Sequence, residues 1–595
     1  METQEKKETK KKKINIFYIL ALIILIFSIF CIFIYITLIS FFTKTIYNFD
    51  NNIKKELFIA IDFGNHESRY AYNFGRNNKI IQGQMGKIPS VIILNKKNLD
   101  GKNYGIKSIN SISNYGEEEM NSIIYKDNLK LMLYNMSNNI NNTISNSSAF
   151  IEVSQTIIEY LKLFTDDIIK EVNSNGANYL KQEINWIITV PRTWNDYAKM
   201  NLINFAQKAG LNHIELALES EVAAISVLED KIIKKEFKTN GKKFLLIDLG
   251  DYKIDISFNE IINNNVKQLM EPIGGNFGSM NINKDLIEVV DQIFGEKTIT
   301  NAKEKQFDEY LQTLKGLEDI KKNIKKNTTD NFEVYAKFER KTSLIDNIID
   351  FFPKLFAFIT RKKFVKEIKY KNYTVKIDEY KIYIPGKLVE EIIQKRVDEI
   401  INFMKSNKIN MKDYNYVVLT GGFSNCEILV HDLRKYFKNV IILSNQENSV
   451  LQGALIYLNN KQKIYSIVSY NAYGIGEYIK NNGINNNKKG EDINKLIERD
   501  DIIRFDNYLN LIVDTNSIQS DFMCFNFYKS PNKNISKEDY FGTLEINLSQ
   551  YKNINSSQFS FNLVIRFIPY FRIDVFDSKT YKKIEYSFSK KLYSS

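Results

Sequence analysis

The sequence predicts an α/β fold behind an N-terminal transmembrane helix, followed by a smaller all-β module. Three observations lead to this prediction: an uncharged apolar run at residues 14–42, short apolar strands alternating with helical patterns over residues 57–470, and a change to short alternating strands from residue 471. With 595 residues, the chain is long enough for several domains. Its 44% hydrophobic and 26% charged residues exclude a disordered, collagen-like or multi-span membrane protein.

The run at residues 14–42 is the first element, and its length predicts an uncleaved membrane anchor. It exceeds the ~20 residues that cross a bilayer core and the ~7–15 apolar residues of a secretory signal, and no small-residue cleavage site follows it. Lysines are more numerous in residues 1–13 than in residues 43–56. The positive-inside rule therefore predicts a basic cytosolic tail at 1–13, a linker at 43–56 and a lumenal body. We expect a type II single-pass protein of the endoplasmic reticulum; the alternative places the body in the cytosol.

The next part of the chain contains four apolar runs that predict strands covered on both faces by helices. Each run ends in an acidic residue, a glycine or a proline, which indicates a turn at that end. The runs are residues 57–64, 184–191, 244–250 and 416–422, and helical patterns lie between them at residues 197–209, 286–294 and 388–404. From residue 471 the long helical patterns end, and alternation of the kind seen in residues 559–567 predicts an all-β module.

Cysteine, histidine and charge patterns narrow the possible functions. The three cysteines form no Cys-x-x-Cys pair and the three histidines form no ligand spacing, which excludes a disulfide framework and a structural zinc site. Of the net charge of +12, the basic tail supplies +3; the remaining +9 is dispersed along the chain, and no recognition motif accompanies it. We therefore expect no nucleic-acid partner.

The turns after the predicted strands carry a repeated acidic pattern. Asp62-x-Gly64 follows the first strand, and Asp248-x-Gly250, with Asp255 seven residues after Asp248, follows the third. Backbone N–H groups of tight turns bind phosphate oxygens, and carboxylates hold Mg²⁺ through its waters. A single Asp-x-Gly is typical of a plain turn. Two of them, together with glycines at 421–422 that let the backbone approach a flat ligand, predict a clamp for a polyphosphate.

These segments resemble the heat-shock-70 family. Residues 186–211, WIITVPRTWNDYAKMNLINFAQKAGL, are similar to that family's Ile-Thr-Val-Pro strand and helix, and residues 216–228, LALESEVAAISVL, to its Asn-Glu-Pro-Thr-Ala-Ala segment. Asp62 to Gly64 and Asp248 to Asp255 match its two phosphate motifs, and Gly421 to Ser424 match its adenosine motif. Residues 70–72 and 272–295 resemble the divergent branch called heat shock 70 kDa protein 12.

The resemblance implies a two-lobed actin-like ATPase fold with ribonuclease H-like lobes. Its parts would be lobe I at 57–243, lobe II at 244–445, a return helix and linker at 446–470, and a β-sandwich-like substrate-binding module without a lid at 471–595. The implied cofactors are ATP or ADP with Mg²⁺, and the implied partners are unfolded or extended peptide clients.

The resemblance also assigns site residues by position. Lys130 would position the attacking water, Glu219 would orient the water network, and Asp62, Asp248 and Asp255 would hold Mg²⁺ through water, which makes Lys130, Glu219, Asp248 and Asp255 the catalytic set. The cofactor-binding residues would be Asp62, Gly64, Asn65, His66, Gly250, Lys253, Gly274, Gly275, Glu318, Lys321, Lys322, Gly421, Gly422, Phe423 and Ser424. Within this set, Glu318, Lys321 and Lys322 share a helix face; a solvated charged face is the alternative.

Three departures from the family pattern bear on activity. Asn65-His66 replaces a threonine pair, Ser220 replaces the proline after Glu219, and residues 251–253 read Asp-Tyr-Lys in place of Gly-Gly-Thr. A non-glycine residue in a left-handed turn position costs about 1–2 kcal/mol. We also expect the Asp251 carboxylate to repel a polyphosphate unless Lys253 neutralises it.

Three functions remain open at this stage. The first is a membrane-anchored, heat-shock-70-like protein that couples ATP binding, with weak hydrolysis, to a peptide-binding β module. The second is a pseudo-ATPase scaffold that binds partner proteins without hydrolysis, which the Asp-Tyr-Lys loop favours. The third is a sugar kinase of the same superfamily, which the C-terminal β module disfavours.

Overall fold

The computed structural model of the protein describes most of the chain beyond the predicted anchor. It describes residues 56–590 apart from gaps at 76–79, 113–114, 139–146, 175–177, 231–232, 234–240, 339–365, 379, 411–412, 461–463, 470, 479–492, 505–508, 515–521, 552–559 and 568–569. The chain divides into residues 1–56 and a unit of residues 57–595. The predicted tail, anchor and nearly all of the linker lie outside the described residues. Within the described ranges, every helix is too short or too polar to cross a membrane.

Lobe I, residues 57–243, is built on a sheet whose first strand is buried on both faces. The sheet has the order β3-β2-β1-β8-β9, with β4 paired to β2. Its strands are β1 (Leu57–Asp62), β2 (Glu67–Phe74), β3 (Ile81–Gln82), β4 (Ile88–Pro89), β8 (Asn185–Val190) and β9 (His213–Leu218). Helices α5 (Ser148–Ser174), α6 (Asp196–Lys208) and α7 (Glu219–Glu229) cover it. Odd-numbered residues of β1 pack in one core and Phe58 and Ala60 in another, because successive side chains of a strand point to opposite faces.

Lobe II, whose first strand begins at residue 243, repeats this arrangement on a second sheet, which also includes strands at 464–468 and 502–504. An antiparallel hairpin is followed by a parallel strand in both lobes, so Asp62 pairs with Thr189 at the same place where Asp248 pairs with Thr420. The strand order is β18-β17-β10-β11-β12-β19-β22. The strands are β10 (Lys243–Leu249), β11 (Ile254–Ile262), β12 (Asn265–Gly275), β17 (Tyr416–Thr420), β18 (Val440–Ile442), β19 (Ile464–Val468) and β22 (Ile502–Arg504); the main helices are α9 (Met280–Phe294), α13 (Gly386–Ser406) and α14 (Glu427–Tyr436). The predicted strands and helices of residues 57–445 are thereby confirmed.

Two smaller sheets extend the lobes, and the one in lobe I meets helices of lobe II. The lobe I sheet consists of β5 (Ile92–Asn95), β6 (Gly101–Tyr104) and β7 (Ile123–Lys126), with α2 (Gly105–Ile112), α3 (Glu117–Asn121) and α4 (Leu129–Asn138) nearby; η1 (Lys181–Glu183) precedes β8. The lobe II sheet consists of β13 (Asn331–Tyr335), β14 (Lys366–Tyr370), β15 (Tyr373–Ile377) and β16 (Lys381–Pro385), with α10 (Thr298–Lys305) and α11 (Phe307–Asn323). The rings of Tyr125 and Phe307 lie 5.2 Å apart in an edge-on contact. Lys303 forms a 2.6 Å ion pair with Asp127. These contacts connect the outer parts of the two lobes.

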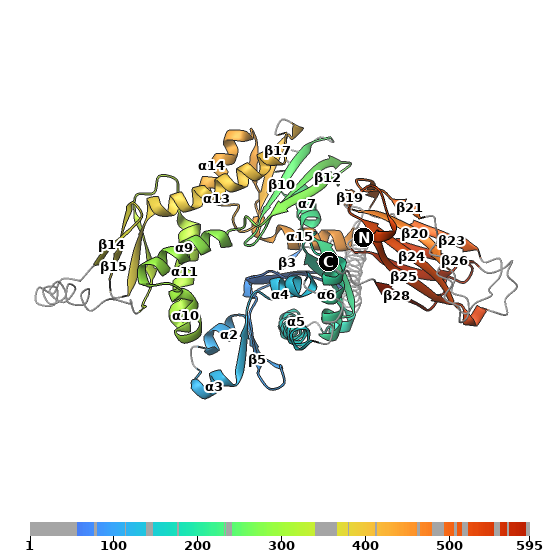
Figure 1. The fold of residues 1–595 in the computed structure, drawn as a ribbon, viewed down its shortest axis with the longest axis horizontal. Helices are drawn as coiled ribbons and strands as arrows, with labels where there is room; N and C mark the ends of the chain where they lie inside the picture. The colour runs from blue at the N-terminus through green and yellow to red at the C-terminus, as the bar shows by residue number, and fades with distance from the viewer. Residues whose placement is uncertain are drawn as a thin grey trace, which may run out of the picture. The chain divides into compact units, whose positions relative to one another are not determined.

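Two helices, α7 and α15, pack against each other between the central sheets of the two lobes (Figure 1). Helix α15 (Ser449–Asn459), which follows η3 (Gln446–Asn448), contacts β1, β2 and β8 of lobe I and packs against α7. A Cβ at Gly453 would lie 1.7 Å from the Val222 carbonyl oxygen, so glycine is required for this close crossing. Because Val222 and Ile225 face the lobe I core and Ala224 and Val227 face lobe II, α7 joins the two lobes.

After α15, the described elements are strands and short 3-10 helices. One sheet has the order β21-β20-β24-β25-β28 and another β23-β26-β27, and residues of both share one apolar core (Figure 1). The elements are β20 (Ala472–Tyr478), β21 (Asn494–Ile497), β23 (Leu509–Asp514), β24 (Phe522–Ser530), η5 (Lys537–Asp539), β25 (Tyr540–Asn547), η6 (Ser549–Tyr551), β26 (Ser560–Arg566), β27 (Arg572–Asp577) and β28 (Tyr586–Lys590). β22 instead pairs with β19 at the edge of the lobe II sheet. A strand from beyond residue 471 therefore belongs to the lobe II sheet.

Candidate functional site

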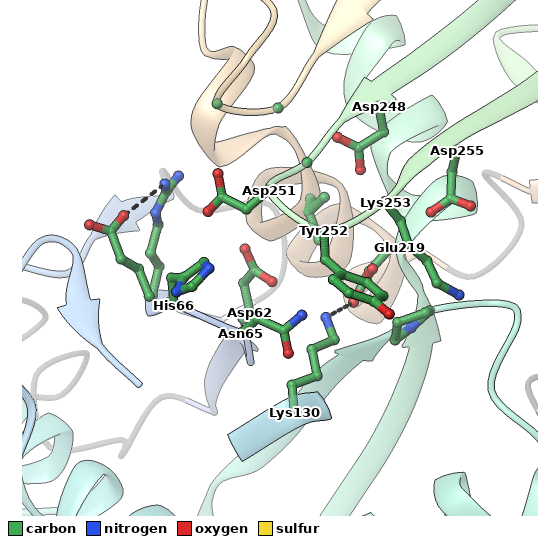
Figure 2. Close-up of a pocket in the computed structure, with 18 of the residues that line it drawn as sticks. Asp62, Asn65, His66, Lys130, Glu219, Asp248, Asp251, Tyr252, Lys253 and Asp255 are labelled. Atoms are coloured by element: carbon green, nitrogen blue, oxygen red, sulfur yellow. Dashed lines mark hydrogen bonds and ion pairs between the residues drawn. The ribbon is translucent and has the colours of Figure 1, made fainter. Parts of the chain in front are cut away.

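A cavity lies where the two repeated hairpins face each other (Figure 2). Its walls come from the turns after β1 and β10, the end of β17 and the start of α15, together with α4 and α7. The cavity brings together twelve of the predicted site residues: Asp62, Gly64, Asn65, His66, Lys130, Glu219, Asp248, Gly250, Lys253, Asp255, Gly421 and Gly422. It is not lined by Gly274, Gly275, Glu318, Lys321, Lys322, Phe423 or Ser424.

Two glycines are needed where the turns enter the cavity. Gly421 has φ +88°, and a Cβ there would lie 2.5 Å from the Leu249 carbonyl oxygen. A Cβ at Gly64 would lie 2.0 Å from the Glu67 carbonyl oxygen. In contrast, a Cβ at Gly422 would meet no atom within 4 Å, so this position faces open space. The turns thus present bare backbone to the cavity, as a phosphate or a flat ring requires.

Four partly buried carboxyl groups, those of Asp62, Glu219, Asp248 and Asp255, line the cavity together. Burial raises the pKa of Asp248 to about 8, and repulsion from Asp255, Glu219 and Asp62 adds to the shift. Burial also raises the pKa of Asp255. Burial raises the pKa of Glu219 to about 7 despite Lys130, whose Nζ lies 2.5 Å from Glu219 Oε1. Lys130 and Lys253, which lower these pKa values, therefore do not offset the effect of burial on the carboxyl groups, and the cavity favours an added cation.

The second loop, residues 250–253, differs from what the sequence predicts. None of its residues has a left-handed φ. The prediction of backbone strain at the Asp-Tyr-Lys sequence is therefore wrong. Lys253 donates to Thr193 Oγ1 at 2.7 Å and lies 5.2 Å from the Tyr134 ring centroid. Its charge acts on Asp255, where it lowers the pKa that burial raises. The hydrogen bond to Asp251 comes instead from Ser279, at 2.8 Å.

The predicted residues outside the cavity wall have other contacts. Phe423 packs in the lobe II core, and Ser424 Oγ donates to the Gly421 carbonyl at 2.7 Å. A Cβ at Gly274 would lie 2.4 Å from Asp255 Oδ1. The glycine therefore leaves room for the Asp255 carboxylate. On α11, Lys321 binds Glu318 at 2.8 Å, and its side chain is 6% exposed. Glu318 and Lys321 thus contact each other within lobe II, and their adenosine contacts stay a prediction.

Several cavity residues have no counterpart in the sequence prediction. They are Glu67, Arg69, Leu131, Tyr134, Pro191, Trp194, Gln446, Glu447, Ser449 and Val450. Arg69 on β2 donates to the Glu447 carbonyl, and Lys87 Nζ lies 2.8 Å from Glu447 Oε1. The alternation of side chains along β2 places Arg69 beside the first turn. Nothing in the neighbouring sequence indicates that η3 contacts Arg69. Within the described part, Asn65 Oδ1 and His66 Nε2 are buried polar atoms without a hydrogen-bond partner.

Known proteins provide an independent comparison. No protein-family model matches the chain. It is 20% identical over 507 residues to heat shock 70 kDa protein 12A of Homo sapiens, covering 72% of this chain and 73% of that protein. It is 22% identical over 298 residues to the chaperone protein HscA of Buchnera aphidicola, covering 49% of this chain and 40% of that protein. The chain is a divergent relative of the heat shock 70 proteins.

This relationship confirms the family that the sequence motifs predict, and with it the actin-like ATPase fold of the two lobes. The heat-shock-70-like chain also aligns with the crystal structure of MreB5 of Spiroplasma citri bound to ADP. That alignment covers 69% of this chain and 98% of MreB5, with a TM-score of 0.43 and 12% identity.

Removing one carboxyl group from the cavity should stabilise the protein without ligand. The pKa of Asp248 is about 8 in the folded protein but ~3.9 in an unfolded chain. Between these values the folded state binds the extra proton, so its stability falls as pH rises. We expect Asp248→Asn to raise the free energy of unfolding by about 1–3 kcal/mol at pH 8 and far less at pH 4.

Urea denaturation of both proteins at the two pH values measures this difference. Asp432→Asn is the control, because the pKa of Asp432 is lowered to about 2 by hydrogen bonds that outweigh its burial. That substitution should destabilise the protein at pH 8. An Asp248→Asn protein that is no more stable than the parent at pH 8 would contradict the charge crowding.

Proposed function

We propose that the cavity binds ATP or ADP with Mg²⁺ and that occupancy controls the C-terminal β strands, which bind extended peptides. The observation that carries the proposal is the convergence of bare turns from both lobes on a cluster of carboxylates with raised pKa. Glycines in the turns allow close approach of a phosphate, and crowded carboxylates suit a divalent cation. The relatives named as chaperones support the peptide-binding part of the proposal.

The residues present fit a magnesium ion held through its waters. Among the residues that the structure describes, no three His, Cys, Asp or Glu side chains lie close enough to ligate a metal directly. Asp62, Asp248 and Asp255 nevertheless line the same cavity, and each would be stabilised in its charged form by a cation. Bound Mg²⁺ supplies charge neutralisation to the phosphates. Lys130, held by Glu219 at 2.5 Å, would orient a water at the end of the phosphate chain.

A pseudo-ATPase that binds nucleotide without hydrolysis is the second candidate. Its support is the second loop, where Lys253 contacts Thr193 and Tyr134, while the carboxylate of Asp251 lines the cavity. A loop that adds negative charge does not help to stabilise the transition state of phosphoryl transfer. Turnover in the presence of Mg²⁺ would separate this candidate from a weak ATPase.

Nucleotide binding can be tested with a variant that fills the cavity and leaves the fold intact. Because a Cβ at Gly422 meets no protein atom within 4 Å, Gly422→Val should fold normally and obstruct the ligand. Calorimetric titration of the detergent-solubilised full chain should show binding of ATP and ADP with Mg²⁺, and at least a tenfold loss with EDTA or in Gly422→Val. Gly116→Val, also in open space but outside the cavity, is the matched control. Absence of binding by the parent chain would refute the proposed ligand.

A buried arginine supports coupling between the cavity and the C-terminal strands. Pro191 lines the cavity, and its neighbour Arg192 donates to Gln268 Oε1 at 3.1 Å and to the Val468 carbonyl at 2.7 Å. Val468 ends β19 and leads into the C-terminal strands. Arg192 also pairs with Glu221 on α7, whose first residue, Glu219, lines the cavity. A shift at Pro191 or α7 is therefore transmitted to Val468 through one guanidinium group.

A second contact fixes the strands to lobe I. Asp196 at the start of α6 binds Lys529 Nζ at 2.9 Å and accepts a 3.4 Å hydrogen bond from the Phe571 N–H. Lys199, one turn further along α6, is buried beside this contact, and burial lowers its pKa to about 8. The junction therefore includes a buried amine that is costly to charge.

The coupling predicts that nucleotide changes peptide affinity and that Arg192 is required for the change. For the parent chain, we expect fluorescence anisotropy with a labelled apolar peptide to show a Kd shift of about 3- to 20-fold when ATP and Mg²⁺ are added. Arg192→Met with Glu221→Gln removes the ion pair without leaving a lone buried charge, and should abolish the shift. Arg434→Met, on the exposed side of α14, is the control. An unchanged shift in the double variant would argue against this route.

We also propose that residues 14–42 anchor the chain with its body on the lumenal side. The support is the uncharged apolar run and the excess of lysines before it. In sealed microsomes, added protease should remove the tail at 1–13 and leave residues 57–595 intact until detergent is added. Digestion of the body without detergent would indicate the opposite orientation.

A further inference from the structure

The loop at residues 250–252 is held by the first N–H groups of α9 and its preceding turn. Gly278, Ser279 and Met280 donate to the carbonyls of Tyr252, Gly250 and Asp251 at 3.2, 3.2 and 2.8 Å. A Cβ at Gly278 would lie 2.2 Å from the Asp251 carbonyl oxygen, so the approach depends on glycine. N–H groups at a helix start, which lack partners within the helix, thus bind the loop backbone. The loop moves only if the start of α9 moves with it.

The Asp251 side chain is connected to a lysine on another helix. Ser279 Oγ donates to Asp251 Oδ1 at 2.8 Å, and Lys321 Nζ on α11 donates to Ser279 Oγ at 3.3 Å. A hydroxyl can donate one hydrogen bond while accepting another, so the two contacts are compatible. Ser279 is 4% exposed and Lys321 8% exposed, so this end of the connection is shielded from solvent, whereas Asp251 is exposed.

The charges explain why this connection matters for a ligand. Asp251 lines a cavity that already contains Asp62, Asp248 and Asp255, and its carboxylate would repel phosphate wherever it points freely into that space. Lys253, the nearest basic residue in sequence, contacts Thr193 instead. Lys321 is therefore the cation connected to Asp251 through a hydrogen-bonded path in the described structure.

We propose that Lys321 is a positioning residue that, through Ser279, fixes the direction of the Asp251 carboxylate and so sets the affinity of the loop for polyphosphate. The proposal rests on the nucleotide-binding function proposed above. It assigns to Lys321 a role on the phosphate side of the ligand, in place of the adenosine contact that the sequence predicts. It also means that a displacement of α11 changes the phosphate loop.

A double-mutant cycle tests the role of Lys321. Titration of the full chain with Mg²⁺ and ATP, ADP or adenosine should show that Lys321→Met weakens ATP about 5- to 50-fold, weakens ADP less and leaves adenosine unchanged. Adding Asp251→Asn should restore most of the loss, since the freed carboxylate is then uncharged. Ser279→Ala, which breaks the path without removing a charge, should give the same order of losses. Lys315→Met, on the exposed side of α11, is the matched control.

Hydrogen exchange of residues 249–255 in the chain without nucleotide gives a second readout. We expect faster exchange of these amides in Lys321→Met and Ser279→Ala but not in Lys315→Met. Equal losses for adenosine and ATP would overturn the proposal in favour of a direct adenosine contact, and so would a lack of rescue by Asp251→Asn. If the parent chain binds no nucleotide, the proposed function fails, and the exchange rates alone then decide whether Lys321 holds the loop.

Discussion

The crowding of carboxyl groups between two repeated hairpins is the constraint on which the rest of the structure depends. Asp62 and Asp248 occupy equivalent ends of β1 and β10, and the fold brings these ends together in one cavity. Burial and mutual repulsion raise the pKa of Asp248 to about 8, which is a cost to the folded protein. Such a cost is typical of functional sites, because a bound cation offsets it only when the ligand is present.

The surrounding helices keep this strained arrangement in place. Helix α7 contributes buried side chains to the cores of both lobes, and α15 crosses it at a contact that only Gly453 allows. Both helices also line the cavity, through Glu219 and through Ser449 and Val450. A change in the separation of the lobes must therefore change the position of groups that would surround a ligand.

The two phosphate-side loops have diverged in different ways. In the first, Asn65 and His66 have buried polar atoms with no partner among the described residues, and they face the cavity. In the second, backbone and side chain alike are held by the start of α9, so a loop without glycine at 251–253 adopts ordinary backbone angles. Polar atoms of the first loop are therefore available to bind a ligand. The second loop is held by hydrogen bonds from the start of α9 in its own lobe.

The sequence by itself determined the features that depend on neighbouring residues. Apolar runs predicted β1, β8, β10 and β17 because a strand buried on both faces is apolar at every position. The Asp-x-Gly turns and Gly421 were recognisable because a tight turn limits which residues fit it. These local patterns also indicated the relationship to the heat shock 70 proteins. They identified twelve residues of the cavity wall.

Only the tertiary structure decided which polar groups the charged side chains contact. Arg69 and the Glu447 carbonyl are 378 positions apart, Arg192 and Val468 are 276 apart, and Lys321 and Ser279 are 42 apart. The sequence pattern Glu318, Lys321, Lys322 fits either an adenosine pocket or a solvated face. The structure excludes a solvated face for Lys321, because this lysine is 8% exposed and its Nζ lies 3.3 Å from Ser279 Oγ. A charged side chain is flexible and its partner is chosen by the packing of distant elements, so its role follows from the fold and not from its neighbours in the chain.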